Sequence, residues 1–216
     1  MEEHLYRIPL FPLGIVLLPS MVYPLHIFED RYKEMINTCL ENNSEFGMVY
    51  YIGDNITEKG CCAKISEITK KYDDGRMDII VEGTDRFEVK KLFYNEKPYI
   101  TADIDFFDDI YDTEDLSLQK TKSEGLELLE NIMSIYSQDS DSDFMKTLSP
   151  KTISFLLVSN AGFTMTEKQA FLEMINTKER LEKGVKILKK LSERLKSTFD
   201  IQTIIQSNGY LGSKKH

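Results

Sequence analysis

Residues 5–32 of the 216-residue chain read LYRIPLFPLGIVLLPSMVYPLHIFEDRY, and this stretch decides how the amino-terminal half is interpreted. Leu5 to Leu10 is a short apolar run that predicts a strand. Four prolines lie between residues 9 and 24, and because proline fixes φ and has no N–H, they predict an irregular loop. From Phe28 to Leu40 apolar residues recur at steps of three or four, which predicts an amphipathic helix.

The chain that follows has the pattern of short strands joined by tight turns. The sequence Asp73-Asp74-Gly75 is a strong hairpin signal, because Asp-Gly favours the turn that matches strand twist. Strands at this spacing predict a closed or partly closed β barrel with one inserted helix. The predicted strands are 46–52, 61–69, 77–81, 87–93 and 99–107.

Beyond Phe107 the pattern changes to helices. An acidic segment, 108–115, predicts a linker, and the polar run 139–143 predicts a solvated loop. Residues 101–150 hold 13 Asp and Glu against 3 Lys and Arg, whereas 151–216 hold 12 Lys and Arg against 6 Asp and Glu. We therefore expect an α+β protein with a barrel lobe at 1–110, a helical lobe at 111–200 and a flexible tail at 201–216. The predicted helices are 116–136, a helix opened by Ser149-Pro150, one opened by a capping box at Thr166 to Gln169, and 177–199.

Composition narrows the class of protein. The net charge of −9 argues against a nucleic-acid backbone as the main partner. The sequence has no run of about 20 apolar residues, so it predicts no membrane span. The acidic start Met1-Glu2-Glu3 argues against a secretory signal. We therefore expect a cytoplasmic protein. The three cysteines, Cys39, Cys61 and Cys62, are expected to be reduced and packed as small hydrophobes.

The sequence contains none of the usual motifs of catalysis or cofactor binding. It has no phosphate-binding loop G-x-x-x-x-G-K-[ST], no dinucleotide motif G-x-G-x-x-G and no nucleophile motif G-x-S-x-G. Its three histidines, His4, His26 and His216, are too scattered for a zinc site. We therefore expect no catalytic residues, no metal and no cofactor.

Three blocks of the sequence resemble the amino-terminal, substrate-binding domain of the Lon protease family, and in particular its stand-alone bacterial form. The first block is IPLFPLG at 8–14 with Leu18-Pro19 and YPLHIFEDRY at 23–32. The second comprises 60–68, the turn 74–76 and VEGTDRF at 81–87, and the third is 166–195. Together the three blocks extend over roughly residues 5 to 199.

The resemblance implies a fold and the absence of an activity. The fold is a β barrel of the pseudouridine-synthase-and-archaeosine-transglycosylase type (PUA-like), followed by an α-helical bundle that ends in a long helix. Full Lon proteases continue into an ATPase and a serine–lysine peptidase, whereas this chain ends at His216. We therefore expect neither peptidase nor ATPase activity.

Several residues of these blocks have a structural explanation. We expect Pro9, Pro12 and Pro24 to hold the loop against the barrel. Glu82 and Arg86 are expected to pair across a corner at which Gly83 lets the chain turn.

Two functions from different classes remain open. The first is a non-catalytic module that binds unfolded or damaged polypeptides, or an adaptor for a protease or chaperone in protein quality control. Its candidate binding residues are Met21, Val22 and Tyr23 in the proline-rich segment, and Phe106 and Phe107 at the predicted junction of the lobes. The alternative is an RNA-binding protein that uses the barrel and the basic helix 183–196. The sequence does not predict the oligomeric state.

Overall fold

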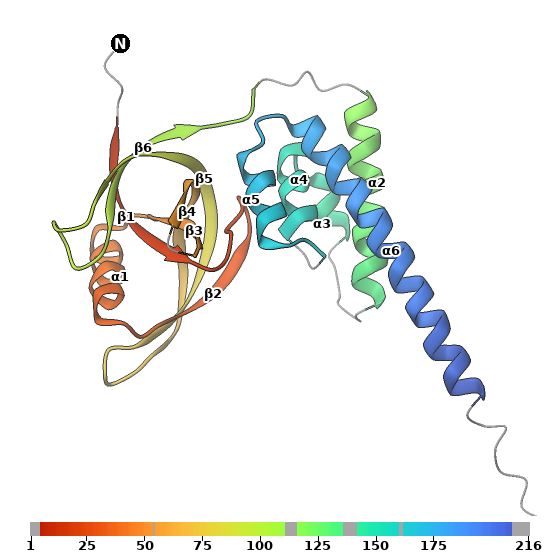
Figure 1. The fold of residues 1–216 in the computed structure, drawn as a ribbon, viewed down its shortest axis with the longest axis horizontal. Coiled ribbons are helices and arrows are strands. Elements are labelled where there is room, and N and C mark those ends of the chain that lie inside the picture. The colour runs from red at the N-terminus through yellow and green to blue at the C-terminus, as the bar shows by residue number, and fades with distance from the viewer. Residues whose placement is uncertain (1–4, 54, 111–115, 136–141, 160–161, 209–216) are drawn as a thin grey trace, which may run out of the picture. The chain divides into compact units, whose positions relative to one another are not determined.

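The computed structural model describes residues 5–53, 55–110, 116–135, 142–159 and 162–208. They form six strands and six helices (Figure 1). The strands are β1 (Tyr6–Leu13), β2 (Val22–Ile27), β3 (Phe46–Ile52), β4 (Asn55–Lys71), β5 (Met77–Phe93) and β6 (Thr101–Phe107). The helices are α1 (Asp30–Asn42), α2 (Leu116–Ile135), α3 (Ser142–Thr147), α4 (Pro150–Ser159), α5 (Met165–Glu173) and α6 (Thr177–Asn208). The chain is α+β with α1 inserted among the strands, which confirms the expected fold class.

The six strands form one mixed sheet in the order β2-β5-β4-β3-β1-β6. Strand β1 runs parallel to β3 and antiparallel to β6. Strand β6 also pairs with the second half of β5, so the sheet curls round on itself. Strand β2 pairs only with the first half of β5 and forms the edge of the sheet. The sheet is curled as expected for a barrel, but it has an open edge, which is formed by β2.

The chain divides into two compact units. The first comprises residues 1–113 and 158–177, and the second comprises 114–157 and 178–216. The segment 158–177, which contains α5, therefore packs with the strands. The lobes predicted from the sequence, 1–110 and 111–200, assign that segment to the helices.

The core of the first unit lies inside the curled sheet. Buried side chains alternate with more exposed ones along the first half of β5, as a half-buried strand requires. Residues 46–49 of β3 and 60–63 of β4 are instead buried without interruption. Helix α1 covers part of the sheet with four buried residues at helical spacing. It ends at Asn42, and Asn43 caps it with a left-handed φ of 46°. One cluster of buried residues in this core consists of Leu10, Val49, Cys62, Phe87, Ala102 and Ile104.

The prediction of one irregular loop from residue 9 to 24 is wrong at both ends. Strand β1 continues through Pro9 and Pro12, and β2 contains Pro24. Proline is tolerated in a strand where its missing N–H does not have to donate to a neighbour. Pro12 lies beside Val49 of β3, and Pro24 lies beside Ile80 of β5 at the sheet edge. The irregular part of the segment is 14–21.

Strands β4 and β5 form a long hairpin whose turn is the one predicted at Asp73-Asp74-Gly75. Gly75 has a φ of 84°, a conformation that favours glycine. The turn is closed by the Tyr72 amide, which donates to the Arg76 carbonyl at 3.0 Å. The two predicted strands 77–81 and 87–93 are a single strand, so no corner exists at Gly83.

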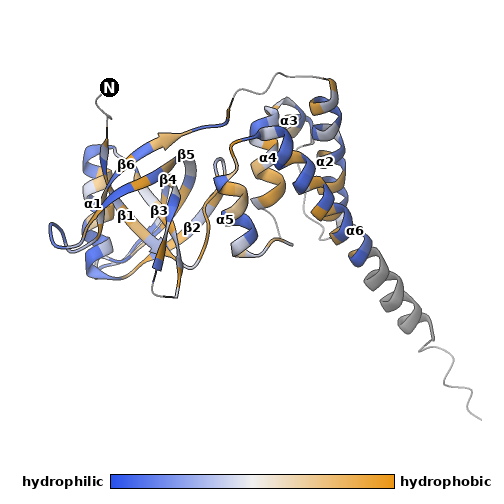
Figure 2. Ribbon diagram, turned by 45° about the horizontal axis from the view of Figure 1, so that its top comes forward, coloured by the Kyte–Doolittle hydropathy of each residue, from blue (hydrophilic) through white to orange (hydrophobic). Residues whose placement is uncertain are grey.

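The second unit contains α2, α3, most of α4 and most of α6. Helix α4 carries hydrophobic colouring along part of its length in Figure 2, and Ile153, Phe155 and Leu157 are buried. Ser149 accepts the Thr152 amide at 3.1 Å, so Ser149 caps α4 as predicted. The Arg180 guanidinium of α6 is buried, donates to Ser154 at 2.7 Å and lies over the Phe155 ring.

Two predicted helix boundaries are corrected. The capping box of α5 is formed by Thr164 and Glu167, and Thr166 lies inside the first turn. Helix α6 continues to Asn208, beyond the end predicted at Phe199 and into the segment predicted to be a tail. Outside the described residues lie 139–141 of the predicted loop 139–143, most of the predicted linker 108–115 and 209–216 of the predicted tail 201–216. Residues 142–143 of the predicted loop are the first residues of α3.

Candidate functional site

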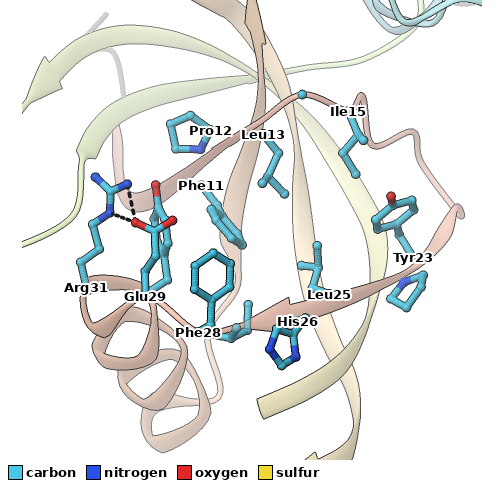
Figure 3. Close-up of a pocket in the computed structure, with 14 residues that line it drawn as sticks. Phe11, Pro12, Leu13, Ile15, Tyr23, Leu25, His26, Phe28, Glu29 and Arg31 are labelled. Atoms are coloured by element: carbon cyan, nitrogen blue, oxygen red, sulfur yellow. Dashed lines mark hydrogen bonds and ion pairs between the residues drawn. The ribbon is translucent and has the colours of Figure 1, made fainter. Parts of the chain in front are cut away.

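A cavity of about 350 Å³ opens in the first unit between β1, β2 and the start of α1 (Figure 3). This volume lies at the lower end of the range found for ligand pockets, which is about 300–1,000 Å³. Two runs of consecutive residues line the cavity, 11–15 from the end of β1 and 23–29 from β2 and the residues that follow it. Arg31 and Tyr32 of α1 complete the wall.

Most of the side chains that line the cavity are apolar or aromatic. Figure 3 shows Leu13 from β1 and Leu25 from β2 pointing into the same space, with Phe11 and Phe28 at one end of it. The Phe11 ring packs on Tyr32 with ring centroids 4.2 Å apart, which fixes that end. Burial raises the pKa of the Tyr32 hydroxyl. Phe28 is 59% exposed and lies before α1, although the sequence predicts it to begin the apolar face of that helix.

Charged and polar side chains form the rim of the cavity and are paired with one another. Glu29 accepts from Arg31 at 2.7 Å. His26 Nδ1 lies 2.5 Å from Asp78 Oδ1, and the Tyr72 hydroxyl donates to the other oxygen of Asp78 at 2.8 Å. These hydrogen bonds, first the one with His26, hold the pKa of Asp78 below its usual range. The rim therefore carries charged groups of both signs, and neither positive nor negative charge predominates there.

The candidate binding residues from the sequence fall into two places. Tyr23 lines the cavity, and its neighbour Val22 is 62% exposed on β2. Met21 lies just before β2, and its carbonyl accepts the Gly83 amide at 2.9 Å. Phe106 and Phe107 lie on β6 and do not line the cavity.

The two phenylalanines of β6 have contacts of their own. The Phe106 ring packs against Tyr6, with ring centroids 5.0 Å apart. The Phe107 ring lies under the guanidinium of Arg86 and beside the ammonium group of Lys59, at 4.7 Å and 5.1 Å. The structure thus separates the five candidate residues into one group near the cavity and one group on β6.

The expected ion pair between Glu82 and Arg86 is not formed, because Glu82 is exposed and Arg86 is buried. Arg86 is only 2% exposed, and its guanidinium donates to Asp109 at 2.6 Å and to the carbonyls of Leu172 and Met174 at 2.9 and 2.6 Å. Asp109 also accepts from the Thr177 hydroxyl. Arg86 therefore joins β5 to the end of α5 and to the residues after β6.

Gly83 has a different function from the one predicted. It lies in the middle of β5, where a Cβ atom would come 2.2 Å from the carbonyl oxygen of Leu18. The Ser20 amide donates to the Gly83 carbonyl at 2.7 Å, and the Gly83 amide donates to Met21. Glycine is thus required for the close approach of the segment that leads into β2.

Within the part of the chain that the structure describes, no group of three or more His, Cys, Asp or Glu side chains is placed to hold a metal ion. None of the described helices has both the length and the apolar character that a membrane span requires.

Sequence reasoning missed most of the residues that form the cavity. Phe11, Leu13, Leu25 and Phe28 all lie in the stretch quoted for the family resemblance, but their pattern is equally typical of a packed core. The signal that could have identified them is the number of apolar residues in this stretch. Apolar residues accompany four prolines there, and they are more numerous than one strand can bury, so some of them have to lie at a surface or a cavity.

The comparisons with known proteins agree on one family. The model of the ATP-dependent protease La (LON) substrate-binding domain matches residues 7–190. The chain is 29% identical over 197 residues to a Lon protease of Buchnera aphidicola, covering 84% of this chain and 24% of that protein. It is 26% identical over 223 residues to Lon protease 1 of Bacillus subtilis, covering 93% of this chain and 28% of that protein. The chain thus spans about a quarter of the length of these curated relatives.

Solved structures show the same fold. A Lon N-terminal domain protein from Xanthomonas campestris superposes with a TM-score of 0.66 at 20% identity, covering 82% of this chain and 96% of that one. The N-terminal domain of a Mycobacterium avium complex Lon protease superposes with a TM-score of 0.70 at 16% identity, covering 85% of this chain and 98% of that one. Because the family model extends over residues 7–190, the chain belongs to the Lon substrate-binding domain family.

Proposed function

We propose that this protein is a non-catalytic module that binds unfolded or damaged polypeptide segments through the cavity between β1, β2 and α1. The observation that supports this function is the apolar and aromatic lining of the cavity in a member of a substrate-binding family. Apolar surface in a concave site gives affinity, and the few polar groups at its rim fix orientation. An unfolded chain exposes the apolar side chains that such a site accepts.

The same surface suits a role as an adaptor in protein quality control. A module that holds an exposed apolar segment can present that segment to a protease or chaperone. Sequence-tolerant binding requires side chains that repack around different partners. Phe28 and Val22 are exposed at the cavity and beside it, and both can adapt to a bound chain.

The RNA-binding alternative has less support. Two of the lysines on the basic face of α6 have carboxylate partners, Lys183 with Glu179 at 2.6 Å and Lys189 with Glu124 at 2.5 Å. These pairs reduce the positive charge available to a phosphate backbone. RNA binding would weaken steeply with added salt, whereas binding in an apolar cavity would not.

The test uses a permanently unfolded protein, reduced and carboxymethylated α-lactalbumin carrying a fluorescent label. We expect the wild-type chain to bind it and Phe28→Ala to weaken binding about tenfold, because the substitution removes an aromatic contact of the cavity. The matched control is Phe144→Ala on α3, since Phe144 is 60% exposed and Phe28 is 59% exposed. Binding that is absent in the wild type, or that both variants weaken equally, would contradict the proposal.

A further inference from the structure

The residues that line the cavity follow one another without gaps. In a strand, successive side chains point to opposite faces, so a wall made by one face of a strand shows every second residue. Here 11–15 and 23–29 both contribute every residue. The cavity is therefore bounded along the edges of β1 and β2, where the backbone as well as the side chains is exposed to it.

Neither of these edges has a partner strand at the cavity among the described residues. Strand β2 is the end of the sheet and pairs only with β5, through Val22 to Ile27. Strand β1 pairs with β6 only as far as Pro9, and Phe11 to Leu13 pair with β3 on one side. An unpaired edge presents backbone donors and acceptors to any extended chain that reaches it.

Pro24 indicates which backbone groups of β2 face outward. Proline has no N–H, so in a sheet it occupies a position at which its backbone nitrogen points away from the neighbouring strand. Pro24 pairs in register with Ile80 of β5, so the N–H groups on the same side as its nitrogen are those of Val22 and His26. His26 lines the cavity and Val22 does not, so His26 supplies the outward backbone donor at the cavity.

We propose that a bound polypeptide docks as an added β-strand on the free edge of β2, with alternate side chains entering the cavity. This inference rests on the proposed function and specifies the form in which the client binds. Addition of a strand takes affinity from main-chain hydrogen bonds and selectivity from pockets for every second side chain. It therefore accepts many sequences, provided that they are extended.

The chemistry of the cavity defines the preferred segment. Leu13, Leu25 and Phe28 favour Leu, Val or Phe at the positions that point inward. The charged groups of the rim are already paired, Glu29 with Arg31 and His26 with Asp78, so a charge on the client gains no partner there. The client is thus a neutral, extended stretch with apolar residues at every second position.

The experiment compares two variants at one position, measured by fluorescence anisotropy with a labelled octapeptide that alternates Leu or Val with Thr. His26→Ala and His26→Pro both remove the imidazole, but only His26→Pro removes the backbone N–H. We expect His26→Pro to bind the octapeptide about tenfold more weakly than His26→Ala, the loss that corresponds to one hydrogen bond. Melting curves of both variants establish that the chain is folded.

A second measurement does not depend on how the variants fold. Two versions of the octapeptide, each N-methylated at alternate amides, lose the donors along one edge or the other but keep every side chain. We expect one or both to bind the wild-type protein at least about tenfold more weakly than the parent peptide. If both bind like the parent and the two His26 variants are equal, strand addition is wrong and the proposed polypeptide binding stands. If the wild type binds neither the octapeptide nor the unfolded protein, the proposed function itself is wrong.

Discussion

At the scale of single residues, Arg86 is the clearest case in which burial decides what a side chain does. Its guanidinium is enclosed by Asp109, by the carbonyls of Leu172 and Met174 and by the Phe107 ring. The sequence places Glu82 four positions away, which suggests a local pair, but both residues lie on one strand and Glu82 points to solvent. The true partners are more than 20 residues distant in sequence, and no local pattern reveals them.

Replacing Arg86 should therefore lower stability far more than replacing Glu82. Arg86→Ala leaves the Asp109 carboxylate without its buried counter-ion, and breaking such a pair costs about 3–5 kcal/mol. Glu82→Ala removes an exposed side chain, which typically changes stability by less than about 0.5 kcal/mol. Urea denaturation of both variants measures the difference. Equal losses in the two variants would restore the local pair as the explanation.

The three thiols make stability depend on pH in the alkaline range. Burial raises the pKa of Cys39, Cys61 and Cys62, so the folded protein keeps these thiols protonated. The stabilising contribution is complete below the unfolded pKa of about 8.5 and is lost as the pH rises above it, because only the unfolded chain then ionises. We expect the free energy of unfolding to fall between about pH 8.5 and 10, with a shallower slope in the double variant Cys61→Ala, Cys62→Ala. An unchanged slope would show that other groups cause the loss.

At the scale of elements, patterns that depend on neighbouring residues were predicted well and those that depend on distant strands were not. The strand 46–52, the turn at Gly75 and the cap at Ser149 follow from local propensity, and all three are present in the structure. The sequence predicts a strand over 5–10 but a loop over 9–24, because prolines are incompatible with a central strand. The end of β1 and the first half of β2 lie within that predicted loop. The structure accommodates Pro24 at a sheet edge, a position that the sequence alone does not reveal.

The first turn of α5 offers a test at this scale. Thr164 accepts the Glu167 amide at 3.2 Å, and the Glu167 carboxylate accepts the Thr164 amide at 2.8 Å. Thr164→Ala should destabilise the protein by about 1 kcal/mol, the usual cost of losing an N-cap. Thr166→Ala, at the position that the sequence suggests for the cap, should cost less than half as much. Thermal unfolding of the two variants decides between the positions, and a larger loss at Thr166 would contradict the observed cap.

At the scale of the whole molecule, the α+β class, the barrel-like sheet and the family were predictable, because they depend on patterns spread over the chain. The composition of each unit was harder to predict. Charge and periodicity change near residue 108, but the segment 158–177 packs with the strands. The contacts that hold it there, such as Gln169 donating to the Lys59 carbonyl at 3.1 Å, join residues far apart in sequence. Among the residues that line the cavity, the sequence names Tyr23 as a candidate binding residue and Pro12 and Pro24 as structural residues, but it predicts no cavity there.

Because segment 158–177 packs with the strands, a fragment of the chain that lacks this segment should be less stable than the full chain. A fragment of residues 1–110 keeps Arg86 and Asp109 but loses the carbonyls of Leu172 and Met174 and the apolar side chains of α5. Each hydrogen bond to a charged group contributes about 1.5–3 kcal/mol, and a domain is stable by only about 5–15 kcal/mol in total. We expect the fragment to unfold at a much lower urea concentration than the full chain, and to bind a dye that reports exposed apolar surface.

Adding segment 158–177 back as a separate peptide should reverse much of this loss. The peptide binds only the folded fragment, so its stabilising effect should rise with peptide concentration and saturate. A peptide of the same composition in scrambled order is the control, because it keeps the charge and hydrophobicity but cannot place Leu172 and Met174 against Arg86. A fragment that is as stable alone as with the peptide would show that residues 1–110 fold independently, as the change in sequence pattern near residue 108 suggests.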